Sequence, residues 1–125
     1  MTRTGREPDE FLPLTPAVFH ILLALADSER HGYGIMRDIA ERTQGSVRMG
    51  PGTLYGTIQR MLADGLIVVA DERPDPAHDD ERRRYYRLSD LGLRVARAEA
   101  LRLERLVRLA QAKRVLYGPE LMGGA

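Results

Sequence analysis

One helix with two contrasting faces constrains the fold of this chain more than any other feature. Gly50 and Pro51 mark its start and Gly65 its end, since proline suits the first helical position and glycine the residue after the last turn. Apolar residues recur on one face with helical spacing: Leu54, Ile58 and Met61. Small or polar residues repeat on another face: Thr53, Gly56, Thr57 and Arg60. One face can therefore pack while the other contacts a partner.

Two short strands are predicted after this helix, at residues 66–70 and 83–88. The first is apolar and β-branched, and the second alternates Arg84 and Tyr86 with Tyr85 and Arg87. The Pro- and Asp-rich residues between them are too polar to bury, so we expect residues 71–82 to project as a loop. A helix followed by two strands around a charged loop is the pattern of a winged helix-turn-helix. The predicted fold is mainly α with a small β-hairpin wing.

Two helices are predicted before this unit. Thr15 is suited to cap the first helix and Pro16 to begin it, and residues 27–32 interrupt its apolar pattern. A second helix follows and ends near Gly45.

A long final helix is predicted from its Ser89 cap to about Tyr117, which spans roughly 40 Å at 1.5 Å per residue. Its apolar residues are too numerous for one narrow stripe, so we expect part of the helix to pack against a second copy of the chain. The alternative is packing within one chain, with a solvated arginine face. The residues assigned to the dimer contact are Leu91, Val95, Leu103, Leu106, Val107 and Ala110.

These elements divide the chain into an N-terminal polar arm (1–13), a winged-helix domain (14–88), a dimerisation helix (89–117) and a tail (118–125). The sequence contains no cysteine, no apolar run of membrane-spanning length and no leader peptide, so we expect a cytoplasmic protein without a membrane partner.

The net charge of +1 conceals a strong segregation of charge. Residues 82–117 hold eleven Lys or Arg against three acids, whereas residues 71–81 hold six acids against Arg73. Because basic residues supply the attraction to phosphates, the second half of the chain is the predicted nucleic-acid contact.

Three motifs together resemble the PadR family of bacterial transcriptional regulators: HGYGI (31–35), GTLYGTIQRMLADGLI (52–67) and RRRYYRLSDLG (82–92). The resemblance covers residues 14–115, and the single final helix is similar to the short PadR subfamily. It implies a winged-helix homodimer that represses promoters and often responds to a small molecule. Gly34 and Gly56 depart from the usual pattern, in which an acidic residue and a proline stand at these positions. The operator sequence is therefore expected to differ.

The resemblance also implies roles for individual residues. The helix after Gly50 would enter the major groove, with Thr53, Thr57 and Arg60 nearest the bases or phosphates. Arg60 is the best candidate for reading a base, although an exposed arginine can serve only solubility. Tyr33 would contact a phosphate, whereas Tyr55 is expected to pack with its hydroxyl at the rim.

The wing would add arginines to this DNA contact. Arg82, Arg83 and Arg84 alternate in direction, so only about half of them can face one surface. Pairing with the acids at 79–81 is the alternative. For a dimer, the expected operator is a pseudo-palindrome of double-stranded DNA with half-sites roughly 34 Å apart.

Other chemistry has little support in the sequence. The three histidines are scattered, and no phosphate loop or nucleophile motif is present, so neither an enzyme, a metal site nor a cofactor is predicted. A small aromatic effector is a further expectation, with Phe11 and Phe19 as candidate contacts. The competing hypotheses are a sensing or interaction dimer without specific DNA binding and a non-specific DNA binder.

Overall fold

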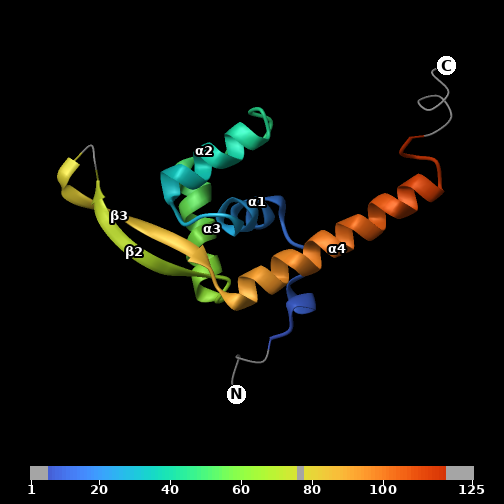
Figure 1. Cartoon of the computed structure of the whole chain (residues 1–125), viewed down its shortest axis with the longest axis horizontal. Helices are drawn as coiled ribbons and strands as arrows, with labels where there is room; N and C mark the ends of the chain where they lie inside the picture. The colour runs from blue at the N-terminus through green and yellow to red at the C-terminus, as the bar shows by residue number, and fades with distance from the viewer. Residues whose placement is uncertain (1–5, 76–77, 118–125) are drawn as a thin grey trace.

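The apolar core is formed by helices that meet at the centre of the molecule, together with the wing strands (Figure 1). The computed structural model describes residues 6–75 and 78–117, with the side chains of residues 74–82 left out. The elements are a 3₁₀ turn η2 (Pro8–Phe11), helices α1 (Pro16–Ala26), α2 (Gly32–Arg42), α3 (Pro51–Ala63) and α4 (Asp90–Ala112), and strands β1 (Arg30–His31), β2 (Ile67–Asp75) and β3 (His78–Leu88). The strands form one antiparallel sheet in the order β1-β3-β2. The predicted winged helix-turn-helix fold is confirmed.

The helix ends follow local signals in the sequence. Thr15 caps α1 by accepting a hydrogen bond from the Val18 N–H at 3.3 Å, as predicted. Gly45 and Gly65, with φ of +81° and +79°, close the turns after α2 and α3. The predicted extents of these helices are therefore confirmed to within a turn.

The wing differs from its prediction, because its strands are longer and its loop shorter. β2 continues to Asp75 and β3 begins at His78, so most of the expected loop 71–82 is paired backbone. The sequence looked too polar for strands because this part of the hairpin lacks apolar alternation, and the described residues Asp71 and Glu72 are exposed. Cross-strand charges replace it: Arg84 lies opposite Glu72, with Nε 3.7 Å from Oε2.

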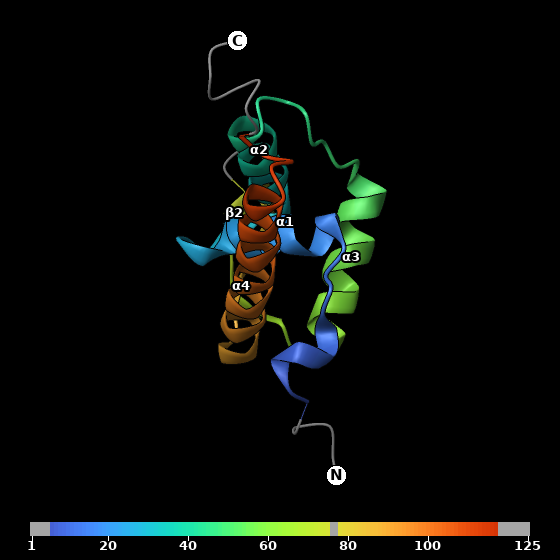
Figure 2. The same cartoon turned by 90° about the vertical axis from the view of Figure 1, so that its right-hand side faces the viewer.

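The start of α4 is fixed on the turn between α3 and the wing. Ser89 caps α4 by accepting from the Gly92 N–H at 2.9 Å, and its own N–H donates to the Leu66 carbonyl at 3.1 Å. α4 ends at Ala112 rather than near Tyr117, since Arg114 adopts a left-handed φ of +62° that no helix continues through. Figures 1 and 2 show α4 projecting from the domain, away from the β2–β3 hairpin.

The segment before α1 is not merely a polar arm. η2 lies against α4, and Phe11 and Leu12 pack against the core. The buried Glu99 on α4 accepts from the Leu14 N–H at 3.3 Å and binds the Arg102 guanidinium at 2.7 and 2.9 Å. The hydrogen bond from Arg102 holds the pKa of Glu99 below its usual value against the opposing effect of burial. The predicted tail 118–125 lies outside the described residues.

Candidate nucleic-acid interface

One face of α3 is open to solvent and carries small or polar side chains. Leu54, Ile58 and Met61 are buried on the opposite face, as their spacing predicted. Thr53 and Arg60 are exposed, and a Cβ built on Gly52 or on Gly56 meets nothing within 4 Å. The open face is therefore unusually flat near its glycines, which suits close approach to another surface.

Thr57 was predicted to lie on the open face and does not. Only 2% of the residue is exposed, and its hydroxyl donates to the Thr53 carbonyl at 2.7 Å. Bonding back to the carbonyl four residues earlier satisfies the hydroxyl inside the core. Thr57 does, however, accept a long hydrogen bond from the Arg60 guanidinium at 3.4 Å, so it orients Arg60 rather than contacting a ligand itself.

Residues of β1, α2, α3 and β3 line a cleft of about 330 Å³. We call it the tyrosine cleft, and its lining residues are His31, Gly32, Tyr33, Tyr55, Arg83, Arg84 and Tyr86. Two arginines and three phenols line it, and none of these lining residues is acidic. Such a lining offers hydrogen-bond donors and positive charge, which match an anion.

The tyrosines of this cleft differ in exposure. Tyr33 is 57% exposed and Tyr55 is 43% exposed. The Arg37 guanidinium lies 5.5 Å from the centre of the Tyr33 ring. Tyr86 is buried, and this burial raises its pKa although Arg84 opposes the rise. Its phenol therefore stays protonated at neutral pH. Sequence reasoning missed Tyr86 and His31, because only the fold brings them beside Tyr55.

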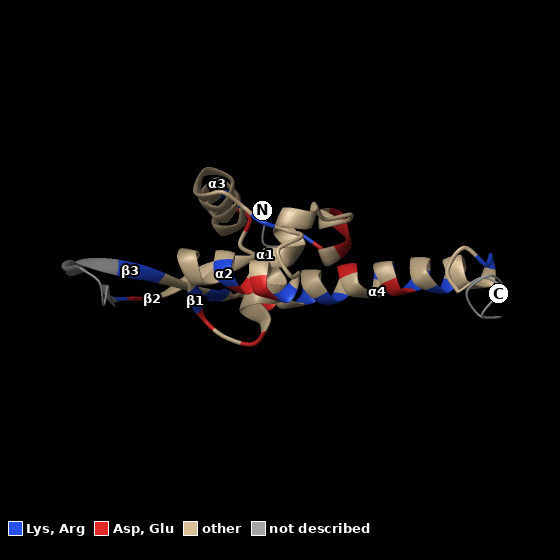
Figure 3. Cartoon of the chain, turned by 90° about the horizontal axis from the view of Figure 1, so that it is seen from above, with Lys and Arg blue, Asp and Glu red and all other residues tan. Residues whose placement is uncertain are grey.

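The wing arginines divide between the two faces of β3. Arg84 and Tyr86 share one face with the core, and Arg83 shares the other with Tyr85. Arg73 on β2 covers the Tyr85 ring at 3.9 Å and pairs with Glu29 at 2.9 Å. Figure 3 shows basic residues on β3 and along α4. The side chain of Arg82 lies outside the described residues.

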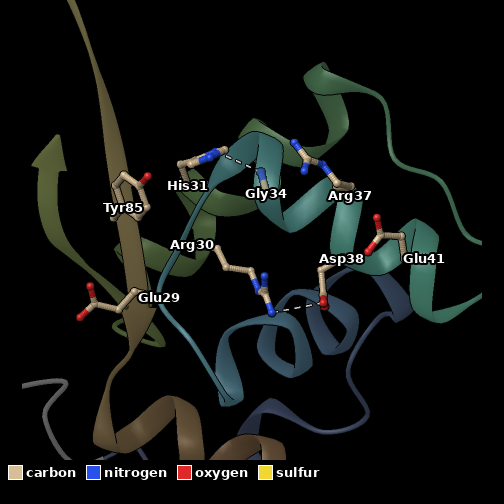
Figure 4. Close-up of a pocket in the computed structure, with 8 residues that line it drawn as sticks. All are labelled: Glu29, Arg30, His31, Gly34, Arg37, Asp38, Glu41 and Tyr85. Carbon is tan, nitrogen blue, oxygen red and sulfur yellow. Dashed lines mark hydrogen bonds and ion pairs between the residues drawn. The ribbon is translucent and has the colours of Figure 1, made fainter. Parts of the chain in front are cut away.

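A second cleft of about 290 Å³ separates α2 from β1 and β3 (Figure 4). Its charges are mixed and several are paired with each other or with neighbours. Arg30 lies 3.3 Å from the Asp38 carboxylate, and Glu29 holds Arg73. His31 stands between the two clefts, with Nδ1 accepting from the Gly34 N–H at 3.0 Å to cap α2. These ion pairs link β1 to α2 and the segment before β1 to the wing strand β2.

The predicted dimer residues fall into two groups. Val95 is fully buried in the core of its own chain, so its assignment to a dimer contact is wrong, and Leu91 packs partly against the same core. No residue of α4 that follows Glu99 in the sequence is buried. Its outer half carries the remaining assigned residues together with exposed Leu101 and Leu109: Leu103, Leu106, Val107 and Ala110.

The described residues also bear on metal binding and membrane insertion. Within residues 6–75 and 78–117, no three His, Cys, Asp or Glu side chains are grouped as metal ligands. The acidic cluster 78–81 has side chains outside the described residues. In the same described ranges, no helix combines the length and apolar character that crossing a membrane requires.

The core helices, the open face of α3 and the wing define a winged helix-turn-helix protein. The model of the "Transcriptional regulator PadR-like family" matches residues 21–98, and the chain belongs to this family. Its members are transcriptional regulators rather than enzymes. The family predicted from the three motifs is therefore confirmed.

Individual relatives agree with this assignment. The chain is 36% identical over 89 residues to the transcriptional regulator Rv3488 of Mycobacterium tuberculosis, covering 71% of this chain and 77% of that protein. A PadR family transcription regulator from Clostridium difficile R20291 superimposes with a TM-score of 0.65 at 21% identity, covering 78% of this chain and 97% of the other. Bacillus subtilis PadR, solved in complex with operator DNA, gives a TM-score of 0.58 at 20% identity over 69% of this chain and 47% of that one.

Proposed function

We propose that the chain is a homodimeric, sequence-specific DNA-binding regulator that represses transcription from the promoters it binds. The observation that carries the proposal is the meeting of α2, α3 and β3 around the tyrosine cleft, beside the open face of α3. The hydrogen-bond donors of the tyrosine cleft suit the phosphates of a DNA strand, and the flat open face of α3 beside them suits the adjacent major groove. The operator DNA in the Bacillus subtilis PadR complex supports this reading.

In this arrangement α3 enters the major groove and the wing lies along the adjacent backbone. Thr53 and Arg60 are the side chains that reach bases, and Arg60 is the stronger candidate because a guanidinium donates to two acceptors on guanine. Tyr33, Tyr55, Arg83 and Arg84 contact phosphates. A protein with this task acts in the cytoplasm, where bacterial promoters lie.

The outer half of α4 supplies the dimer contact. Leu106, Val107 and Leu109 are each between 44% and 53% exposed, an apolar surface that one chain leaves uncovered. Covering it contributes about 25 cal/mol per Å² of apolar area, which favours a second copy of the same helix. A two-fold axis between the copies then sets half-sites about one helical turn apart, roughly 34 Å, in a pseudo-palindromic operator.

Release by a small aromatic effector completes the proposal, at a site other than the one the sequence indicated. Phe11 and Phe19 are partly buried and pack against the core. A groove of about 360 Å³ lies instead between η2 and α4, where Pro8, Ala98 and Leu101 provide apolar contact. Since it adjoins the outer half of α4, a ligand there would act on the dimer contact.

The test begins with selection of genomic fragments by the purified protein. The best fragment is then titrated against a scrambled duplex over a salt series. We expect preference for one inverted repeat, with an affinity that falls steeply as salt rises. Weak and equal binding to both duplexes would favour a non-specific binder, and absence of binding would favour the interaction dimer. A promoter–reporter fusion then distinguishes repression from activation.

A further inference from the structure

Gly32 is in close contact with a residue of another helix. It is the first residue of α2 and is buried, and a Cβ built on it would lie 2.6 Å from Cζ and 2.7 Å from Cε1 of Tyr55. Real side chains do not approach so closely, so any residue other than glycine forces the Tyr55 ring to move. Its backbone φ gives no reason for glycine, because only the space filled by Tyr55 demands it.

The Tyr55 ring therefore lies against the start of α2, and Tyr55 and Gly32 both line the tyrosine cleft. Tyr33, Tyr86 and Arg84 line the same cleft. Tyr55 sits on α3, so it also ties the cleft to the helix proposed to enter the major groove. Tyr55 is 43% exposed, so it is not sealed inside the core.

Arg83 adds a second guanidinium to the lining of the cleft, and His31 lies against it. His31 Nδ1 accepts the hydrogen bond from the Gly34 N–H that caps α2, and its Nε2 lies 2.9 Å from Arg83 Nη1. The positive charges of Arg83 and Arg84, next to the phenols that line the same cleft, suit the oxygens of a phosphate group.

We propose that the tyrosine cleft binds a single phosphate of the DNA backbone and that Gly32 is the residue that positions the Tyr55 hydroxyl to donate to it. The inference rests on the proposed DNA-binding function and adds a defined site and a positioning residue. The phosphate belongs to DNA because the cleft is continuous with α3, whose open face is the proposed groove contact.

The test compares three substitutions on the duplex selected above: Gly32→Ala, Tyr55→Phe and Gly34→Ala. Gly34→Ala is the matched control, since its added methyl would lie 3.5 Å from His31, an ordinary contact, on the same helix. We expect Gly32→Ala and Tyr55→Phe each to weaken binding about tenfold, the loss of one hydrogen bond to a charged group. Gly34→Ala should bind as the parent chain does.

Two further readouts separate positioning from a general structural effect. The double variant Gly32→Ala/Tyr55→Phe should bind no more weakly than Gly32→Ala alone, because both changes remove the same hydrogen bond. A set of duplexes, each with one phosphate replaced by a neutral methylphosphonate, should reveal one position where the parent chain loses affinity. Gly32→Ala and Tyr55→Phe should be insensitive to replacement at that position.

The outcomes that overturn the inference are distinct from those that overturn the function. Full affinity in a folded Gly32→Ala variant, additive losses in the double variant, or equal sensitivity of all variants at every phosphate would each refute it. If Gly32→Ala lowers the melting temperature sharply, Tyr55→Phe with the phosphate scan decides alone. A parent chain that binds no selected duplex overturns the proposed function together with this inference.

Discussion

Gly92 holds the start of α4 against the backbone of the preceding turn, and adding one methyl there should destabilise the fold. A Cβ built on Gly92 would lie 3.0 Å from the Leu66 carbonyl carbon and nearer still to its oxygen. That oxygen accepts the Ser89 N–H at 3.1 Å, so it belongs to the cap of α4. Because the obstructing atoms are backbone, no side-chain rotation relieves the contact, and α4 has to shift.

The size of the effect follows from two opposing terms. Overpacking of a buried position costs about 3 kcal/mol at the upper end of its usual range. Alanine regains about 1 kcal/mol over glycine in a helix. The net loss is about 2 kcal/mol, which corresponds to a melting temperature lower by roughly 8 °C for a chain of this size.

Thermal unfolding of Gly92→Ala, followed by circular dichroism, measures this loss. Protein concentration is held equal, since the stability of a dimer depends on it. Gly56→Ala is the control: it makes the same substitution inside a helix where nothing lies within 4 Å, and its melting temperature should rise slightly. A Gly92→Ala variant that melts with or above the parent chain would refute the packing argument.

Four other outcomes are expected. Gly56→Ala should weaken operator binding despite its higher stability, because its methyl obstructs approach to the groove; unchanged affinity in a titration would contradict that close approach. Arg60→Ala should cost about 1–3 kcal/mol on the operator and much less on scrambled DNA, as measured by competition. Leu106→Arg should convert the proposed dimer to folded monomers in sedimentation at micromolar concentration, since it would place charges face to face on α4. Glu99→Gln should make the stability of the fold less sensitive to acid. Because folding lowers the pKa of Glu99 below its usual value of 4.5, the ionised carboxylate stabilises the fold at pH values above 4.5, and this stabilisation is lost as the pH falls below 4.5. Urea unfolding midpoints of both chains, measured across this pH range, would show the difference.

The sequence predicted the elements whose signals are local. Thr15, Ser89 and the Gly50–Pro51 pair act on backbone groups within one turn, so their capping roles can be inferred without knowing the fold. The buried face of α3 follows in the same way from the spacing of Leu54 and Ile58. The basic character of β3 was also visible, because charge segregation is a property of composition along the chain.

Assignments that depend on which segments meet in space could not be made in advance. Thr57 has the spacing of the open face, yet it is buried in the folded chain. Val95 fits a dimer stripe equally well, but the domain of its own chain buries it. Helical periodicity gives the angle of a side chain around its axis and leaves open what occupies the space beside it.

Only the tertiary structure created the candidate site. Gly32, Tyr55 and Tyr86 come from α2, α3 and β3, and their common cleft depends on the packing of all three. The hydrogen bond between Glu99 and Leu14 joins residues 85 positions apart in the sequence. The two wing strands pair charged segments, each of which has the composition of a loop when its sequence is considered alone. Local hydrogen bonds and periodicity therefore determined the helices of this protein. The packing of elements that are distant in the sequence determined which side chains lie together, because local sequence patterns do not specify which elements become neighbours in the fold.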